Sequence, residues 1–157
     1  MIPRLILMVG IPGSGKSSWL EEQGLYKNPA FIILCPDQVR KELCGNISDQ
    51  SRNIEVWDIV KIKTITCLKQ GISVVLDATN VSTTNRRTFI KGLPTCILQA
   101  KLFPADPAQC YVRILKDLEQ NKNRADVPEE TLYKMFGEYL YSEKVIQSEG
   151  FEVITVI

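Results

Sequence analysis

The sequence contains no histidine, and that absence excludes several classes of site. Ser-His-Asp and Cys-His triads, H-E-x-x-H zinc sites and histidine phosphocarriers all need an imidazole. A general base in this chain must therefore be a carboxylate, a lysine or a tyrosine. The five cysteines are odd in number and widely spaced, so they form neither a zinc pattern nor an evident disulfide framework. They are expected to be free thiols in a reducing cytoplasm.

Net charge and long apolar runs are also scarce. The 19 basic and 18 acidic residues leave a net charge of +1, so any affinity for nucleic acid must come from a local basic patch. No apolar run approaches the ~20 residues of a membrane span, and no membrane is expected to be involved. The apolar start of the chain leads directly into a glycine loop and indicates a buried strand rather than a signal peptide. One domain is expected over residues 1–157.

The order of apolar runs and helix signals predicts an α/β fold. Short, continuous apolar runs are typical of strands covered on both faces of a parallel sheet. Strands are expected at residues 5–9, 31–34, 74–76, 97–103 and, more weakly, 151–157. Helices are expected at residues 16–23, 106–120, from 128 onward and, despite many β-branched side chains, at 52–70. The expected architecture is a three-layer α/β sandwich around a central parallel sheet of about five strands.

Residues 10–17 read Gly-Ile-Pro-Gly-Ser-Gly-Lys-Ser and match the phosphate-binding pattern G-x-x-x-x-G-K-S at every fixed position. Gly13 and Gly15 let the backbone approach phosphate oxygens, so that several N–H groups converge on the β-phosphate. Lys16 would bridge the β- and γ-phosphates, and the Ser17 hydroxyl would ligate Mg²⁺. The alternatives are a glycine-rich turn with an incidental lysine, or a loop that binds nucleotide without catalysis.

A second carboxylate follows the apolar run that ends at residue 76. Asp77 resembles a Walker B residue, which holds Mg²⁺ directly or through water; otherwise it only opens the turn that follows. A guanine-binding switch is not expected. The run ends in Asp-Ala-Thr-Asn rather than Asp-x-x-Gly, and Arg124 stands where guanine recognition usually needs an aspartate.

An acceptor site is expected after the strand at residues 31–34. Asp37 belongs near the carboxyl end of that strand, where α/β sheets place ligands. With no histidine available, Asp37 is the natural base to orient and deprotonate an acceptor hydroxyl. Arg40 shares a helix face with Asp37 and can hold an anionic group of the acceptor. In the alternative, Asp37 caps its helix and Arg40 is solvated; spacing alone favours neither.

A lid is expected at residues 120–128, a polar segment between two helices that carries Lys122 and Arg124. In small P-loop kinases such a segment closes over the nucleotide and brings a guanidinium to the transferring phosphoryl group. A solvated basic loop would show the same sequence pattern.

Together these elements resemble the 5′-hydroxyl polynucleotide kinase domain of bacteriophage and bacterial nucleic-acid repair enzymes. The resemblance spans nearly the whole chain and implies the three-layer sandwich of P-loop kinases, with about five parallel strands and a helical lid. Its matching pieces are residues 10–19, Asp37-x-x-Arg40, Asp77-Ala-Thr-Asn80, Arg86-Arg87, and residues 121–124 followed by Val127-Pro128. The phosphate loop is specific to a superfamily. The Asp-x-x-Arg and Asp-x-Thr-Asn pieces narrow the resemblance to a group of kinases that act on polynucleotides and on some small molecules.

The resemblance implies a role for each matching residue. The implied ATP-binding residues are Gly13, Ser14, Gly15, Lys16, Ser17, Ser18 and Arg124. The implied Mg²⁺ ligands are Ser17 and Asp77. The implied catalytic residues are Asp37 as general base, with Lys16 and Arg124 on the donor phosphates. The implied acceptor-binding residues are Asp37, Arg40, Thr79 and Asn80. For Arg86 and Arg87 a structural role is expected.

The sequence departs from the family pattern in three ways. Gln120 stands where an arginine is common, so one phosphate contact is missing or comes from Lys122. The phosphatase or ligase domain that is often fused to such kinases is not expected here. The near-neutral charge is less suited to a polyanionic acceptor.

The leading prediction is ATP-dependent transfer of the γ-phosphate to a 5′-hydroxyl of DNA or RNA, with Mg²⁺ as cofactor. One alternative keeps the reaction but takes a small metabolite, nucleoside, nucleotide sugar or other small phosphorylated molecule as acceptor. Another is a nucleotide-binding interaction module without useful turnover, against which the intact Lys16, Ser17, Asp37 and Asp77 argue. Family relatives are sometimes oligomeric, so the partners include a possible second copy of the chain.

Overall fold

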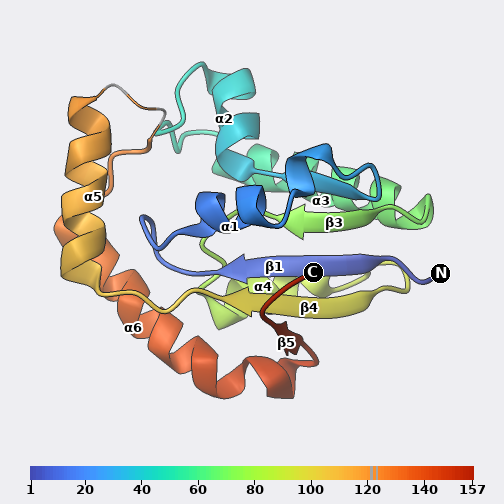
Figure 1. Ribbon diagram of the computed structural model, residues 1–157. Helices are drawn as coiled ribbons and strands as arrows, with labels where there is room; N and C mark the ends of the chain where they lie inside the picture. Colours follow the sequence, from blue (N-terminus) through green and yellow to red (C-terminus); the bar gives the residue numbers. More distant parts are fainter. Residues whose placement is uncertain (121, 123) are drawn as a thin grey trace.

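The computed structural model describes residues 1–120, 122 and 124–157. Five strands form one sheet, in which every neighbouring pair is parallel. The strands are β1 (Arg4–Val9), β2 (Phe31–Leu34), β3 (Ser73–Leu76), β4 (Ile97–Leu102) and β5 (Glu152–Ile154). Their spatial order is β2-β3-β1-β4-β5, so the strand that leads into the phosphate-binding pattern lies in the centre (Figure 1).

Within the described part of the chain, six helices connect the strands: α1 (Lys16–Glu22), α2 (Pro36–Cys44), α3 (Asn53–Lys69), α4 (Thr83–Ile90), α5 (Pro107–Glu119) and α6 (Glu129–Val145). Two short 3₁₀ turns follow α1 and α6, namely η1 (Leu25–Lys27) and η2 (Ile146–Glu149). The starts of two helices follow from local chemistry. Asp106 caps α5 by accepting a hydrogen bond from the Ala108 N–H at 2.9 Å, and Ser82 caps α4 through the Asn85 N–H at 3.2 Å.

The core lies on both faces of the sheet because successive side chains of a strand point to opposite sides. On β1, Leu5, Leu7 and Val9 face one cluster, and Ile6 and Met8 face the other. The first cluster contains buried side chains of α3, α4, α5 and α6, and the second contains those of α1 and η1. The sheet is therefore the middle layer of three, which explains the continuous apolar runs.

The predicted three-layer α/β fold is confirmed, and four strands agree with the predicted ranges to within one residue. The fifth is shorter than predicted and covers only Glu152–Ile154. The helix predicted at residues 52–70 is confirmed as α3, whose buried face supplies Val56, Val60, Thr64 and Leu68 at helical spacing. All five cysteines are free. Among the described helices, none is long and apolar enough to cross a membrane.

Candidate active site

The candidate residues follow the carboxyl ends of three neighbouring strands and therefore lie at one edge of the sheet. The phosphate-binding loop follows β1, Asp77 follows β3, and Asp37 lies just after β2. Because neighbouring strands are about 4.8 Å apart, the three loops must lie side by side. The Gly10 N–H donates a hydrogen bond to the Thr79 carbonyl oxygen at 3.0 Å, which ties the first loop to the second.

The loop after β1 has the backbone geometry of a phosphate cradle. Gly13 and Gly15 have φ values of 80° and 97°, which other residues rarely adopt. A Cβ on Gly13 would also lie 3.0 Å from the Cys110 carbonyl oxygen of α5. The Lys16 ammonium folds back onto the carbonyl oxygens of Gly10 and Ile11, at 3.0 and 2.9 Å. The first N–H groups of α1 have no intrahelical partner and can donate to phosphate oxygens.

Lys16, Asp77 and Asp37 are electrostatic neighbours. Burial lowers the pKa of Lys16 to about 8, an effect that the charge of Asp77 opposes. Burial also raises the pKa of Asp77, while the Lys16 charge lowers it and the Asp37 charge raises it. The two carboxylates therefore share one site, in which a cation relieves their mutual repulsion.

The predicted Mg²⁺ ligands suit that metal. Ser17 is exposed at the start of α1, and Asp77 is half-buried in the loop after the neighbouring strand β3. Hydroxyl and carboxylate oxygens are hard ligands, and Mg²⁺ usually takes its remaining ligands from nucleotide phosphates and water. Among the described residues there is no group of three acidic, cysteine or histidine side chains that would hold a metal without a nucleotide.

Asp37 and Arg40 form an ion pair in the first turn of α2, with an Nη1–Oδ1 distance of 2.5 Å. Arg40 is buried, and its Nη2 donates a second hydrogen bond to Asn53 of α3 at 2.8 Å. Its Nε is buried and has no hydrogen-bond partner among the described residues. The alternative of a capping Asp37 with a solvated Arg40 is wrong, because Cys35 occupies the cap position and Arg40 is buried.

The segment between α5 and α6 brings Arg124 near the phosphate loop. The Arg124 charge lowers the pKa of Lys16, so the two cations face the same site. Arg124 itself donates from Nε and Nη2 to Asp117 Oδ2, at 3.0 and 2.5 Å. Lys122 pairs with the same carboxylate at 3.6 Å. Asn121 and Asn123 of the predicted lid lie outside the described residues.

Asn80 and Arg86 hold the turn after β3. The Asn80 amide donates to the Met8 carbonyl oxygen at 2.7 Å, and its φ of 52° completes the turn. Arg86 donates to the Asn80 carbonyl oxygen at 2.7 Å and pairs with Glu149 of η2 at 2.7 Å. Arg86 and Glu149 are both fully buried, whereas Arg87 is exposed. Arg86 thus stabilises the turn that carries Thr79 and Asn80.

Comparison with known families agrees with this geometry. The family described as AAA domain matches residues 5–139, which cover most of the chain and every candidate residue. The chain belongs to this family. No curated protein matches the sequence.

Solved structures share the fold of this AAA domain. A chain of the Pnkp1/Rnl/Hen1 RNA repair complex superposes with a TM-score of 0.75 at 21% identity, over 91% of this chain and 46% of that one. A chain of a second Pnkp1/Rnl/Hen1 complex superposes with a TM-score of 0.63 at 23% identity, over 71% of this chain and 39% of that one. A candidate kinase from Chloroflexus aurantiacus superposes with a TM-score of 0.64 at 17% identity, over 98% of this chain and 88% of that one. The AAA domain therefore has a P-loop kinase fold and spans less than half of the two repair-complex chains.

Sequence reasoning missed two residues of the AAA domain's site. Asn53 fixes Arg40, but no motif marks it because it contacts α2 only after α3 has packed there. Arg113 of α5 donates to the Gly13 carbonyl oxygen at 3.0 Å. No local pattern marks Arg113, because it meets the loop only through the packing of α5 against it.

Proposed function

We propose that the chain is an ATP-dependent kinase that transfers the γ-phosphoryl group of ATP to a 5′-hydroxyl of DNA or RNA. The observation that carries this proposal is the ion pair of Asp37 with the buried Arg40, one strand away from Asp77 and two from the phosphate loop. A base and an anion-binding guanidinium are thus fixed beside a donor site. The family and the shared fold support a kinase; the acceptor is our inference.

The reaction assigns one task to each group. The Asp37 carboxylate accepts the proton of the 5′-hydroxyl, whose oxygen forms a bond to the γ-phosphorus. The bond from that phosphorus to the β–γ bridging oxygen breaks, and ADP leaves with its electron pair. Lys16 and Arg124 offset the charge on the transferring phosphoryl group, and Mg²⁺ held with Ser17 and Asp77 would supply further charge stabilisation.

Arg40 supports an acceptor that carries a phosphate. Its guanidinium uses Nη1 and Nη2 on Asp37 and Asn53, yet the buried Nε lacks a partner among the described residues. A buried donor without an acceptor is costly, and an acceptor oxygen from a bound phosphate would satisfy it. A nucleotide 3′ of the hydroxyl supplies such an oxygen, whereas a free nucleoside does not.

The direct test is transfer of labelled phosphate from ATP to 5′-hydroxyl oligonucleotides of DNA and of RNA. The matched control is the same strand with a 5′-phosphate, which offers no acceptor. Labelled product with the 5′-hydroxyl strands alone is expected. Robust transfer to nucleosides or sugars, with none to any strand, would overturn the proposal. ATP binding without transfer or hydrolysis would indicate an interaction module.

A small acceptor is the second candidate, and one observation favours it. A cavity of about 500 Å³ beside the site is the size of a single small molecule rather than of a strand. Salt separates the two candidates. The KM for a strand is expected to rise steeply with salt, because bound phosphates release counterions, whereas the KM for a neutral metabolite would hardly change. The cytoplasm, which supplies ATP, is the proposed compartment.

A further inference from the structure

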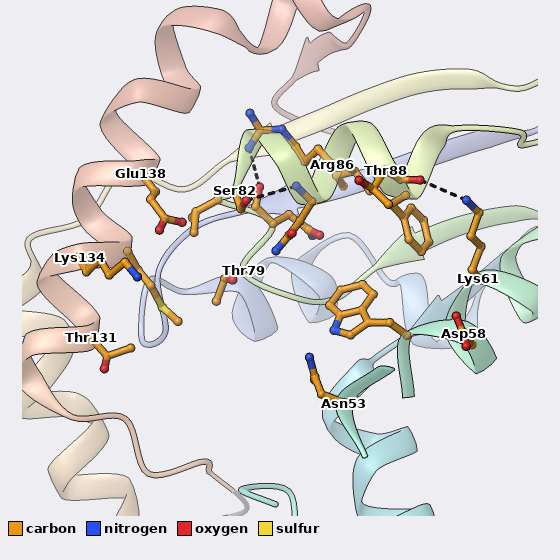
Figure 2. Close-up of a pocket in the computed structure, with 17 residues that line it drawn as sticks. Asn53, Asp58, Lys61, Thr79, Ser82, Arg86, Thr88, Thr131, Lys134 and Glu138 are labelled. Carbon is orange, nitrogen blue, oxygen red and sulfur yellow. Dashed lines mark hydrogen bonds between the residues drawn. The ribbon is translucent and has the colours of Figure 1, made fainter. Parts of the chain in front are cut away.

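The cavity of about 500 Å³ lies on the side of the sheet that α3, α4 and α6 cover (Figure 2). Leu7 of β1 and the turn from Thr79 to Ser82 form one part of its lining. Side chains of the three helices form the rest. The volume suits one nucleoside-sized molecule, since ligand pockets usually measure about 300 to 1,000 Å³.

Two contacts connect this cavity to the proposed reaction centre. Asn53 lines the cavity, and its Oδ1 accepts the hydrogen bond from the Arg40 Nη2 at 2.8 Å. Thr79 also lines the cavity, and its carbonyl oxygen accepts the hydrogen bond from the Gly10 N–H of the phosphate loop at 3.0 Å. A molecule in the cavity would therefore lie against two residues, one of which directly contacts Arg40 and the other the phosphate-binding loop.

One wall of the cavity is aromatic. Trp57 of α3 and Phe89 of α4 pack edge to face, with ring centroids 6.0 Å apart at 78°. The Trp57 indole N–H donates to no described residue, although Trp19, the other tryptophan, is buried and donates to the Thr155 carbonyl oxygen at 3.0 Å. Tryptophan usually satisfies its N–H when it packs, so Trp57 presents a flat ring and an unused donor to a ligand.

The opposite wall offers polar groups of both signs. Figure 2 shows Thr131, Lys134 and Glu138 extending from α6 toward the turn that carries Thr79 and Ser82. Across the described residues, neither Lys134 nor Glu138 forms an ion pair, although they are one helical turn apart. The unpaired carboxylate of Glu138 can accept hydrogen bonds and the ammonium of Lys134 can donate them. Together they suit a neutral ligand with donors and acceptors along its edge better than a polyphosphate, which the carboxylate would repel.

We propose that this cavity binds the heteroaromatic base of the acceptor's 5′-terminal nucleoside. The inference rests on the proposed function, because it names what the kinase recognises. The base would pack on Trp57 and present its edge to Lys134 and Glu138, while the sugar lies toward Asn53 with its 5′-hydroxyl toward Asp37.

The first experiment needs no variant. The wild-type protein and labelled ATP are given two 5′-hydroxyl oligonucleotides that differ only in the first residue, which is either a normal nucleotide or an abasic tetrahydrofuran. We expect kcat/KM to fall about 5- to 150-fold for the abasic strand, mainly through KM, since base–aromatic stacking has that magnitude. Equal kcat/KM values for the two strands would overturn the inference.

The second experiment locates the effect in the cavity. Trp57→Ala should lower kcat/KM for the normal strand and leave the abasic strand unchanged, whereas Trp57→Phe should retain most of the difference between strands. Glu138→Gln should alter the ranking of the four possible first bases. Tyr133→Ala, an exposed neighbour on α6 outside the cavity lining, is the matched control. If Trp57→Ala slowed both strands equally, Trp57 would be structural and the inference would fail.

A binding measurement covers the case of an unstable Trp57→Ala protein. Tryptophan fluorescence of the wild type should change on titration with a nucleoside 3′-monophosphate and stay constant with ribose 5-phosphate. Trp57→Phe should abolish the change, because the remaining Trp19 is buried elsewhere. A response that persists in Trp57→Phe would contradict the inference. No transfer to any strand would instead refute the proposed function, so the two failures are distinguishable.

Discussion

Arg40 and Asp37 are joined by a 2.5 Å ion pair whose two members differ sharply in exposure: 5% for the arginine and 53% for the aspartate. The buried partner is fixed by Asn53 as well, so it cannot follow the carboxylate into solvent. The pair therefore orients a half-exposed carboxylate at the edge of the sheet where three loops converge. Such a carboxylate is accessible to an acceptor yet held in one position, as a general base requires.

Replacing the proposed base should separate chemistry from binding. Asp37→Asn keeps the size of the side chain and removes its ability to accept a proton. We expect kcat to fall about 10²- to 10⁴-fold, the usual contribution of a general base, with ATP affinity nearly unchanged. Single-turnover transfer and ATP titration measure the two quantities. Glu42→Gln on the same helix is the matched control and should behave as wild type. If the activity of Asp37→Asn were unchanged, Asp37 would not be the general base.

The lid cation is the second testable feature. Arg124 is tied to Asp117 through two hydrogen bonds, while Lys122 approaches the same carboxylate only at 3.6 Å. If Arg124 reaches the transferring phosphoryl group, Arg124→Ala should lower kcat about 10³-fold or more, and Lys122→Ala less than about tenfold. Steady-state kinetics decide the point. The reverse ranking would identify Lys122 as the lid cation.

The Asp117 carboxylate gives a complementary prediction. Because Asp117 pairs with Arg124, we expect Asp117→Asn to free the guanidinium for ATP. We expect a lower KM for ATP and a kcat within about threefold of the wild type, since Asp117 is not proposed to contact the transferring phosphoryl group. A higher KM would mean that Asp117 orients Arg124 for ATP rather than withholding it.

The pKa of Lys16 predicts proton uptake on ATP binding. Burial lowers that pKa to about 8 in the free protein, and phosphate oxygens would raise it because they favour the charged ammonium. At pH 8.5 the free lysine is mostly neutral, so binding should take up a fraction of a proton; at pH 7 it should take up little. Calorimetry in buffers of different ionisation enthalpy measures the uptake. Lys16→Arg, which stays charged, should show none.

The same pKa shift predicts a trend in stability. An unfolded chain keeps the Lys16 proton up to about pH 10.5, whereas the folded chain loses it near pH 8. The unfolded state then binds more protons between these values, so this residue's contribution to stability rises with pH across the interval. The free energy of unfolding in urea should therefore increase from pH 8 to pH 10 for the wild type relative to Lys16→Met. If the difference in unfolding free energy between the two proteins stayed constant over this range, the pKa of Lys16 would not be lowered.

Arg86 and Glu149 supply a prediction about stability alone. Both side chains are 1% exposed, and the pair links α4 to η2. Glu149→Gln would leave a buried arginine without its counter-charge, which typically costs about 3 to 5 kcal/mol. Urea denaturation should show that loss, whereas the exposed Arg87→Gln should stay within about 0.5 kcal/mol of the wild type. A loss below about 1 kcal/mol for Glu149→Gln would show that the pair is dispensable.

Much of the fold could be predicted because its signals are local. The apolar runs of β1 and β3 and the capping residues of α5 depend on neighbouring residues alone. The α4 helix was missed because its eight residues include three threonines and an asparagine, which are weak helix formers, and only the Ser82 cap marks its start. β5 was overextended because an alternating pattern does not indicate where sheet pairing stops. Pairing with β4 limits it to Glu152–Ile154.

The sequence by itself determined the predicted phosphate-binding loop, since backbone geometry at Gly13 and Gly15 and the position of Lys16 follow from a contiguous motif. It also limited the base to residues such as Asp37, because no histidine is present. Only the tertiary structure decided that Arg40 is buried against Asn53, and that Trp57 and Phe89 face α6 across a cavity. These contacts join segments far apart in the chain. They depend on how helices pack on the sheet, which no local pattern encodes.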